Sequence, residues 1–323
     1  MDYGFAAMNF LRRWWIRWNG DWVKDESPDW LSACAALAGT IILFPLVNML
    51  PALGFDWLTY FWARDFNQYP PWTEWALLPL LILPWRDGVA LLNGLLMMTV
   101  AITTAREVYR RAGNTSWAVT NEALGAATLA LLSPSVWILM WVVNIESLAL
   151  LGSLFLPWGL PLILLKPHVY VWAILSRRKW IIWAAIFGVA SLLIWGGWPL
   201  TVMESVNGRI QHPAAFGWSG VGLPVILIGV VLLIFTNADP LRLMAAGSFL
   251  SPFLMPQHFV LLLPALGRVR GWQRFGLWAG AWLMAIPVMF GDWMNIKYLA
   301  LGFPLLIWWM LRPDSKWLSP RAA

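Results

Sequence analysis

Residues 88–111 read GVALLNGLLMMTVAITTAREVYRR, an uncharged apolar run followed at once by a basic cluster. The run comes close to the length of about 20 residues that an α-helix needs to cross the hydrocarbon core of a bilayer. Arg106, Arg110 and Arg111 follow it, and basic residues beside a span mark its cytoplasmic end. This segment therefore predicts a transmembrane helix that ends in the cytoplasm.

The composition extends this interpretation to the whole chain. Of its 323 residues, 60% are apolar and 12% are charged, whereas soluble globular proteins have roughly 25% charged residues. Tryptophan, which favours the interface between lipid tails and headgroups, occurs 27 times. A soluble fold of this size could not bury so much apolar surface. We therefore expect an all-α, polytopic integral membrane protein.

Further apolar runs predict about ten to twelve crossings in total. The clear spans are expected near 31–52, 88–105, 116–135, 180–199, 220–236, 275–291 and 294–311. The stretches 136–176 and 241–267 are also apolar, but they contain many prolines and polar residues. Each of these two stretches predicts shorter or broken helices that pack against their neighbours.

The basic residues indicate the orientation of the chain, because 17 of the 22 fall in one alternating set of connections. This set comprises Arg12, Arg13, Arg17, Lys24, Arg106, Arg110, Arg111, Arg177, Arg178, Lys179, Arg242, Arg268, Arg270, Arg274, Arg312, Lys316 and Arg321. The opposite set holds Arg64, Arg86, Lys166, Arg209 and Lys297. The positive-inside rule places the first set, and with it both termini, on the cytoplasmic side of the inner membrane. The net charge of +6 is then explained by anionic lipid, and no nucleic-acid partner is expected.

One proline-rich segment, PPWTEWALLPLLILPW at 70–85, would reverse this orientation if it crossed. We interpret it as a juxtamembrane helix on the outer face, within an outer loop at 53–87. The remaining organisation is a cytoplasmic segment at 1–30, a single transmembrane domain at 31–311 and a cytoplasmic tail at 312–323.

With this topology, the leftover polar residues gather at the outer face. They are His168, His212, His258, Asp56, Asp65, Glu74, Asp87, Glu146, Glu204, Asp292, Lys166 and Arg209. Ionisable groups at membrane depth are costly, so such a group of residues suggests a site, although ordinary solvated loops are the alternative. No spacing is typical of a dedicated metal motif, and no cofactor is expected. The outer carboxylates leave a divalent cation as an alternative, because they offer oxygen ligands.

Four stretches then occur in an order that resembles a known family. They are Asp56–Trp57 with Tyr69–Pro70–Pro71 and Leu83–Pro84; Asn144–Ile145–Glu146–Ser147; Leu165–Lys166–Pro167–His168 with Arg177–Arg178–Lys179–Trp180; and Leu250–Ser251–Pro252 with Gln257–His258 and Leu261–Leu262–Leu263–Pro264. Together, over about residues 55–265, they resemble the polyprenyl-phosphate-mannose-dependent mannosyltransferases of the GT-C glycosyltransferase superfamily.

The resemblance implies a GT-C-like fold and a transferase whose site faces outward. It would move a mannose-like sugar from a polyprenyl-phosphate donor to a lipid, glycan or protein acceptor. An acidic residue of the first outer loop serves catalysis in that superfamily, and Asp56 matches best, with Asp65 second. A carboxylate can take the proton of an attacking hydroxyl. The alternative for Asp56 is a helix cap, for which Asp is a favoured residue.

The donor phosphate needs a cation, and Lys166 is the best candidate because it precedes a proline at an outer helix break. His168 and His258 can donate hydrogen bonds to the same phosphate, while Arg64 and Arg209 are second choices. The motif residues Tyr69, Asn144 and Glu146 are expected to bind substrate. The alternative for Lys166 is that it only extends its ammonium group to the lipid headgroups.

Two other functions remain open at this point. A transporter or flippase for a lipid-linked substrate is one, although the polar residues lie at the outer face instead of the midplane. A non-catalytic scaffold or subunit of a larger membrane complex is the other, and its protein partners are unknown. It predicts no outward cavity that joins Asp56 to Lys166.

Overall fold

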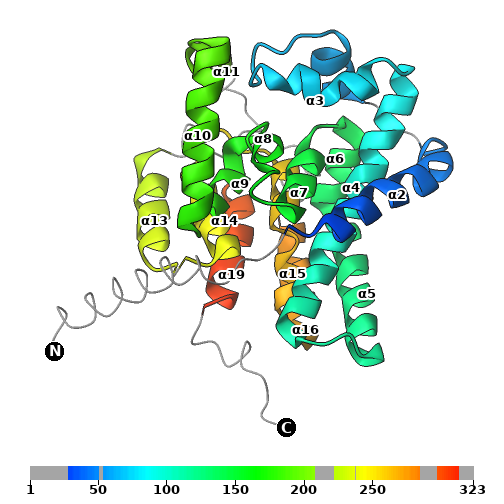
Figure 1. Ribbon diagram of the computed structural model, residues 1–323. Coiled ribbons are helices and arrows are strands. Elements are labelled where there is room, and N and C mark those ends of the chain that lie inside the picture. Colours follow the sequence, from blue (N-terminus) through cyan, green and yellow to red (C-terminus); the bar gives the residue numbers. More distant parts are fainter. Residues whose placement is uncertain (1–27, 51–53, 208–221, 237, 284–296, 313–323) are drawn as a thin grey trace.

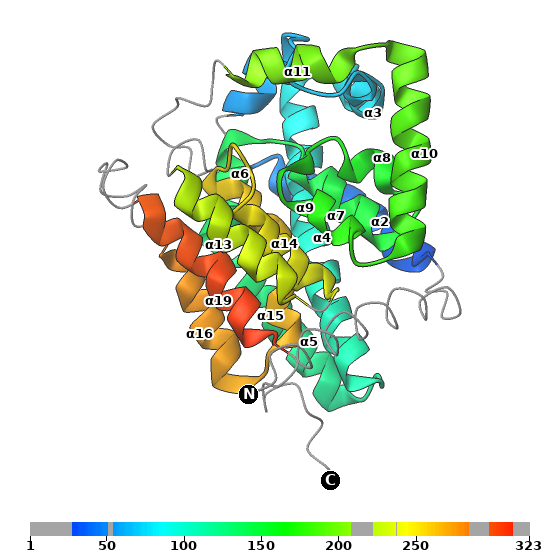
Figure 2. The same ribbon diagram turned by 90° about the vertical axis from the view of Figure 1, so that its left-hand side faces the viewer.

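The computed structural model describes residues 28–50, 54–207, 222–236, 238–283 and 297–312, and this part of the chain is helical, without strands (Figures 1 and 2). Its elements are α2 (Trp30–Val47), η1 (Trp57–Trp62), α3 (Trp72–Leu81), α4 (Trp85–Ala112), α5 (Trp117–Leu131), α6 (Pro134–Val142), α7 (Glu146–Leu154), α8 (Leu160–Ile163), α9 (Pro167–Ile174), α10 (Arg178–Trp195), α11 (Trp198–Asn207), α13 (Leu223–Ile234), α14 (Pro240–Ser248), η2 (Pro256–Leu262), α15 (Ala265–Arg268), α16 (Gly271–Trp282), η3 (Lys297–Leu301) and α19 (Gly302–Met310). The all-α prediction is confirmed for the described residues.

Three of the described helices, α2, α4 and α10, are long and apolar enough to cross a membrane. The pair α5 and α6, bent by 54° at its break, is a fourth candidate. The segments predicted at 220–236 and 294–311 contain shorter apolar helices, and part of 275–291 lies outside the described residues. The membrane character is therefore supported, whereas the predicted count of crossings and the GT-C architecture stay predictions.

The two proline-rich stretches are broken as predicted. Residues 136–176 contain most of α6 and then the short helices α7, α8 and α9, and 241–267 contain most of α14, then η2 and α15. Pro167 and Pro256 each occupy the first position of a helix, where the missing N–H costs no hydrogen bond. These breaks bring helix ends, with their polar side chains, into the interior.

The predicted juxtamembrane segment forms α3, a helix of 10 residues. Figure 1 shows α3 lying across the upper end of the molecule, roughly perpendicular to α4 and α10, and Figure 2 shows α11 beside it. A helix in this direction is not aligned with the candidate membrane spans α4 and α10. Its place on the outer membrane surface stays a prediction.

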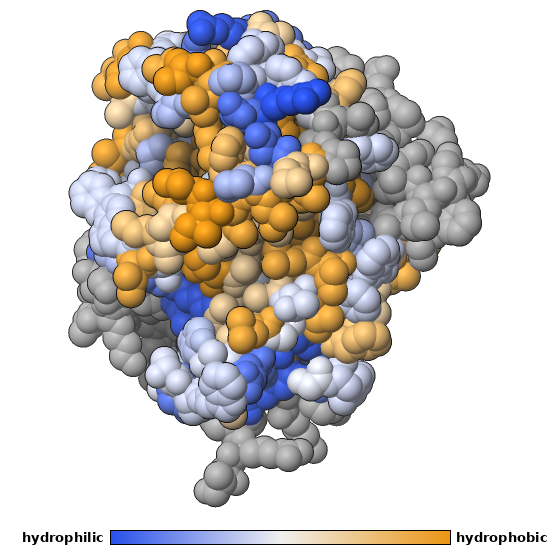
Figure 3. All heavy atoms as spheres, turned by 90° about the vertical axis from the view of Figure 1, so that its right-hand side faces the viewer, coloured by the Kyte–Doolittle hydropathy of each residue, from blue (hydrophilic) through white to orange (hydrophobic). Residues whose placement is uncertain are grey.

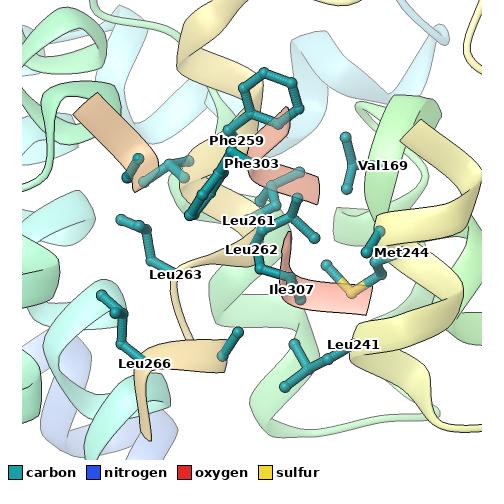
Figure 4. Close-up of a cluster of buried hydrophobic side chains, with 14 of the residues drawn as sticks. Val169, Leu241, Met244, Phe259, Leu261, Leu262, Leu263, Leu266, Phe303 and Ile307 are labelled. Atoms are coloured by element: carbon teal, nitrogen blue, oxygen red, sulfur yellow. The ribbon is translucent and has the colours of Figure 1, made fainter. Parts of the chain in front are cut away.

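The largest core packs η2 against α14 and α19 (Figure 4). Phe259 and Leu262 of η2 contact a cluster that includes Phe303, Ile307 and Met244, and each of these side chains is buried. The irregular η2 segment is thereby enclosed by apolar side chains, which fixes the polar residues that it carries.

The surface of the protein carries large apolar side chains that water would solvate poorly. Leu31, Ile42 and Leu193 are 83%, 76% and 82% exposed, respectively. Figure 3 shows hydrophobic surface across the middle of one face, with hydrophilic patches towards the top and bottom. Lipid contact removes the cost of such exposure, so this distribution suits a membrane environment.

Two of the predicted cytoplasmic connections meet at one end of the molecule. Arg268 pairs with Glu107 of α4, and both Arg111 and Arg274 pair with Glu122 at 2.6 and 2.7 Å. Connections that are far apart in the sequence thus share carboxylates. This convergence agrees with the common side that the basic residues predict, while its cytoplasmic location stays a prediction.

Candidate functional site

A break between α6 and α7 positions two of the motif residues. Val143 ends α6 with a φ of 56°, and Glu146 begins α7 two residues after Asn144. The Asn144 Oδ1 atom accepts a hydrogen bond from the Ile145 N–H at 2.7 Å, and its Nδ2 donates to Asp56 Oδ2 at 2.5 Å. Asn144 therefore joins the first outer loop to the interior helix α7.

Asp56 stands directly before η1, but its side chain makes no capping hydrogen bond to that helix. The alternative, in which Asp56 caps the juxtamembrane helix, is wrong as well, because Pro71 occupies the N-cap position of α3. The next residue, Trp57, is fully buried and anchors the start of η1 in the core. Asp56 is thus held on a fixed backbone with its carboxylate oriented by the Asn144 amide.

Lys166 is buried and forms an ion pair with Glu146, with Nζ 2.8 Å from Oε1. The Lys166 residue is only 6% exposed, and Glu146 is not exposed at all. A lysine that only extended its ammonium group to the lipid headgroups would be solvated there. Lys166 is buried, so it does not have that arrangement. Two charges are buried here together, and each compensates the other.

Two histidines lie against this ion pair. The Nδ1 atom of His258 accepts a hydrogen bond from the Met255 N–H at 3.2 Å, so it carries no proton. The proton of a neutral His258 is then on Nε2, which lies 3.4 Å from Glu146 Oε1. The ring of His168 stacks on His258 with centroids 4.9 Å apart, and Phe253 contacts both rings.

Tyr69 connects the two halves of the cluster. Lys166 Nζ lies 5.9 Å from the centroid of the Tyr69 ring. Burial raises the pKa of the Tyr69 phenol well above its ordinary value, and the nearby charges of Asp56 and Glu146 raise it further, against a hydrogen bond with Asn144. The phenol therefore stays protonated and is available as a hydrogen-bond donor between the two carboxylates.

A groove with a volume of about 510 Å³ begins at Lys166 and His168. Its remaining wall is mostly apolar and is formed by α9 and α10, with Val171, Ile174, Leu175, Ile181, Ala184, Ala185 and Gly188. The polar residues Lys166 and His168 therefore adjoin an apolar surface that suits a hydrocarbon chain.

Aromatic residues from α3, α10 and α11 also line this groove. Trp72 contacts the ring of Phe187 at 4.9 Å and that of Trp198 at 5.0 Å between centroids. Its Nε1 donates to the Pro161 carbonyl oxygen at 3.0 Å, which fixes its orientation. The residues predicted from the sequence did not include Trp72, Phe187 and Trp198. The density of Trp residues near both ends of α10 was the only signal for them.

The remaining predicted residues do not join the cluster. Asp65 is exposed and hydrogen-bonded within its own loop, and Arg64 is exposed with Nη1 3.8 Å from Glu74. Arg209 lies outside the described residues. Of the two acidic candidates in the first outer loop, the structure brings Asp56 into contact with the other motif residues.

Two buried polar atoms of the cluster have no hydrogen-bonding partner in the described part of the chain. Apart from Glu146 Oε1, which forms the ion pair with Lys166, they are Glu146 Oε2 and the Ser147 hydroxyl oxygen, both at the start of α7. Buried polar atoms without a hydrogen-bonding partner are rare in folded proteins. Where they do occur, a bound ligand or water is one explanation. Ser147 lies in the quoted motif, but the sequence analysis did not single it out.

No family model, no curated protein and no solved structure matches this chain. Within the described ranges, no group of three or more His, Cys, Asp or Glu side chains is arranged to hold a metal ion. The divalent cation therefore stays an untested alternative. Function has to be inferred from the geometry of the cluster and from the resemblance of the four stretches.

Proposed function

We propose that this protein is a GT-C-type membrane glycosyltransferase. It transfers a mannose-like sugar from a polyprenyl phosphate to a lipid, glycan or protein acceptor at the outer face of the cytoplasmic membrane. The observation that carries the proposal is the position of Lys166, buried at the end of an apolar groove and joined through Tyr69 and Asn144 to Asp56. A lipid phosphate requires such a pairing of one cation with a hydrocarbon-binding surface.

The groove suits part of a polyprenyl chain. Its volume of about 510 Å³ falls within the roughly 300 to 1,000 Å³ of small-molecule sites. From Ile181 to Ser191 it follows α10, a length of about 15 Å at the rise of an α-helix. Because the chain of a membrane lipid is already in hydrocarbon, its transfer into the groove yields little hydrophobic free energy, and the groove contributes packing and shape instead. The polar end is therefore expected to supply most of the affinity.

The phosphate is placed beside Lys166, with His168 as a second donor at the same end of the groove. An ammonium group has three N–H donors, and Glu146 accepts in one direction only. As the bond between the sugar and the phosphate breaks, negative charge grows on the phosphate oxygen. A fixed cation in a site shielded from water stabilises that charge strongly.

The acceptor hydroxyl oxygen attacks the anomeric carbon, and its proton passes to the Asp56 carboxylate. A new bond forms between the acceptor oxygen and the sugar, while the old bonding pair leaves with the polyprenyl phosphate. Tyr69 lies between the lysine and the aspartate, so the anomeric carbon is expected beside its ring. Asn144 is a positioning residue, because it acts by orienting Asp56.

The two competing functions are less well supported. A non-catalytic scaffold predicts no outward cavity that joins Asp56 to Lys166. The groove is lined by Lys166 and Tyr69 but not by Asp56, so the connection to Asp56 rests on the contacts of Tyr69 and Asn144. A transporter predicts polar residues along both halves of one path, and the groove wall along α10 is mostly apolar.

Transfer of a labelled sugar from mannosyl-phosphoryl polyprenol, in liposomes that contain a membrane lipid extract, tests the proposal. Asp56→Asn is expected to lower the rate by about 100-fold or more while donor binding persists. Asp65→Asn, which removes a carboxylate from the same loop, is the matched control and is expected to keep full activity. Equal rates for wild type and Asp56→Asn would overturn the assigned catalytic role.

A further inference from the structure

The ion pair of Lys166 and Glu146 has an electrostatic consequence for the two lipids that the proposed reaction involves. The donor is a phosphodiester with one negative charge. The product is a phosphate monoester, which carries about −1.5 to −2 charges at pH 7 because its second pKa is near 6. A site that held phosphate through charge alone would bind the product more tightly than the donor, and the product would block it.

The charges around Lys166, which lines the groove, are nearly balanced. Lys166 contributes one positive charge and Glu146, 2.8 Å away, one negative charge. His258 is the neutral Nε2-protonated form, since its Nδ1 accepts a hydrogen bond, and His168 stacks on it. Asp56 lies beyond Tyr69, which remains a neutral phenol. Lys166 is the one cation among these residues, so its local attraction can serve one phosphate charge, and no other positive charge among them compensates a second.

We propose that Glu146 sets the charge preference of the phosphate site, so that the groove accepts a singly charged phosphate lipid and releases the doubly charged product. The inference rests on the proposed function and concerns the same site. The carboxylate stays beside Lys166 when the lipid binds, and its Oε2 atom has no partner in the described structure that would draw it away. A second phosphate charge about 4 Å from it is strongly disfavoured in such a low-dielectric site.

This charge preference makes product binding depend on pH. The monoester can enter only as its monoanion, so above its second pKa it must take up a proton in order to bind. Its dissociation constant is therefore expected to rise about tenfold for each pH unit between pH 7 and pH 8.5. A phosphodiester has no group that titrates in this range, so its affinity is expected to stay constant.

Two probes with the same chain separate the inference from the proposed function. Undecaprenyl monophosphate and undecaprenyl methyl phosphate, a diester without a sugar, are titrated onto the full-length protein in nanodiscs at pH 7 and pH 8.5. In wild type, the affinity for the monophosphate is expected to fall as the pH rises, whereas the affinity for the diester is expected to stay constant. In Glu146→Gln the pH dependence of the monophosphate is expected to disappear, and Glu74→Gln, at an exposed outer carboxylate, is expected to behave as wild type.

The outcomes are distinguishable. Binding of both lipids with the same pH dependence in wild type overturns the inference and leaves the proposed function standing. If neither lipid binds, or if binding is unchanged in the double variant Lys166→Met with Glu146→Gln, the proposed function fails as well. The wild-type pH comparison needs no variant, so the inference stays testable even if Glu146→Gln does not fold.

Discussion

The buried ammonium group of Lys166 is paired with one carboxylate, that of Glu146. Removing a single member of a buried ion pair leaves the other charge uncompensated, so Lys166→Met or Glu146→Leu is expected to destabilise the fold by about 3–5 kcal/mol. The double variant removes both charges and is expected to be close to wild type. Chemical unfolding in detergent micelles measures the free energies of unfolding of wild type, the two single variants and the double variant. If the loss in the double variant equalled the sum of the two single losses, the ion pair would be contradicted.

The amide of Asn144 is expected to matter for rate more than for binding. Asn144→Ala removes the hydrogen bond by which the amide orients the Asp56 carboxylate, and a misplaced catalytic group costs on the order of 100-fold in rate. The prediction is therefore a lower kcat at an unchanged KM for the polyprenyl donor.

Asn67→Ala is the matched control for this experiment, because Asn67 donates to Asp65 at 3.0 Å in the same loop. It is expected to leave both constants unchanged. A rise in KM without a change in kcat for Asn144→Ala would show that the amide binds substrate instead of orienting Asp56.

The sequence alone singled out Asp56 and Lys166 but could not choose between Asp56 and Asp65. Both aspartates are in one short loop, and their separation depends on η1, whose turn directs one towards Asn144 and leaves the other in solvent. No local pattern predicts such a turn. The choice depends on a contact with a residue 88 positions away.

At the scale of elements, the close approach of α15 to α4 depends on one glycine. A Cβ atom on Gly267 would collide with the backbone carbonyl oxygen of Thr104, which cannot move without distorting α4. Gly267→Ala is therefore expected to destabilise the protein by about 1–3 kcal/mol. Thermal unfolding in detergent measures the loss.

Gly276 in α16 provides the control, since a Cβ there meets no heavy atom within 4 Å. Gly276→Ala is expected to be neutral or to stabilise the helix by up to about 1 kcal/mol. Similar losses for the two variants would mean that helix propensity, and not the contact with Thr104, determines the effect.

The broken helices were predictable from sequence, but the groove was not. Proline has no N–H and cannot continue a helix, so residues such as Pro167 fix where an element begins. The groove instead depends on which side of α10 faces α9 and on Trp72, whose hydrogen-bonding partner Pro161 is 89 positions away. Long-range contacts of this kind leave no periodic signal in an almost uniformly apolar helix.

At the scale of the molecule, the orientation can be tested by labelling. Cys34 is the single cysteine, so Cys34→Ala provides a background without thiols. In it, Asn67→Cys is expected to react with a membrane-impermeant maleimide in intact spheroplasts, whereas Asn114→Cys reacts only after permeabilisation. Both positions are exposed, so access is not limited by packing. The reverse pattern would invert the topology.

The membrane class and the grouping of basic residues followed from composition and charge, because both are properties of the whole chain. The number of crossings is harder to read. An apolar run of about 20 residues predicts a span only if it is one continuous helix, and here several such runs fold as shorter or bent helices. Hydropathy measures the cost of leaving lipid, and it does not detect where the backbone breaks.

Trp72, Phe187 and Trp198 contact one another along the groove. The chain of the proposed donor is dissolved in the bilayer, so we expect the lipid to enter this groove sideways from the surrounding hydrocarbon. Occupancy then follows the mole fraction of the lipid in the bilayer, and its concentration in the buffer matters little. Short-chain, water-soluble analogues are consequently poor competitors even when they carry the correct headgroup.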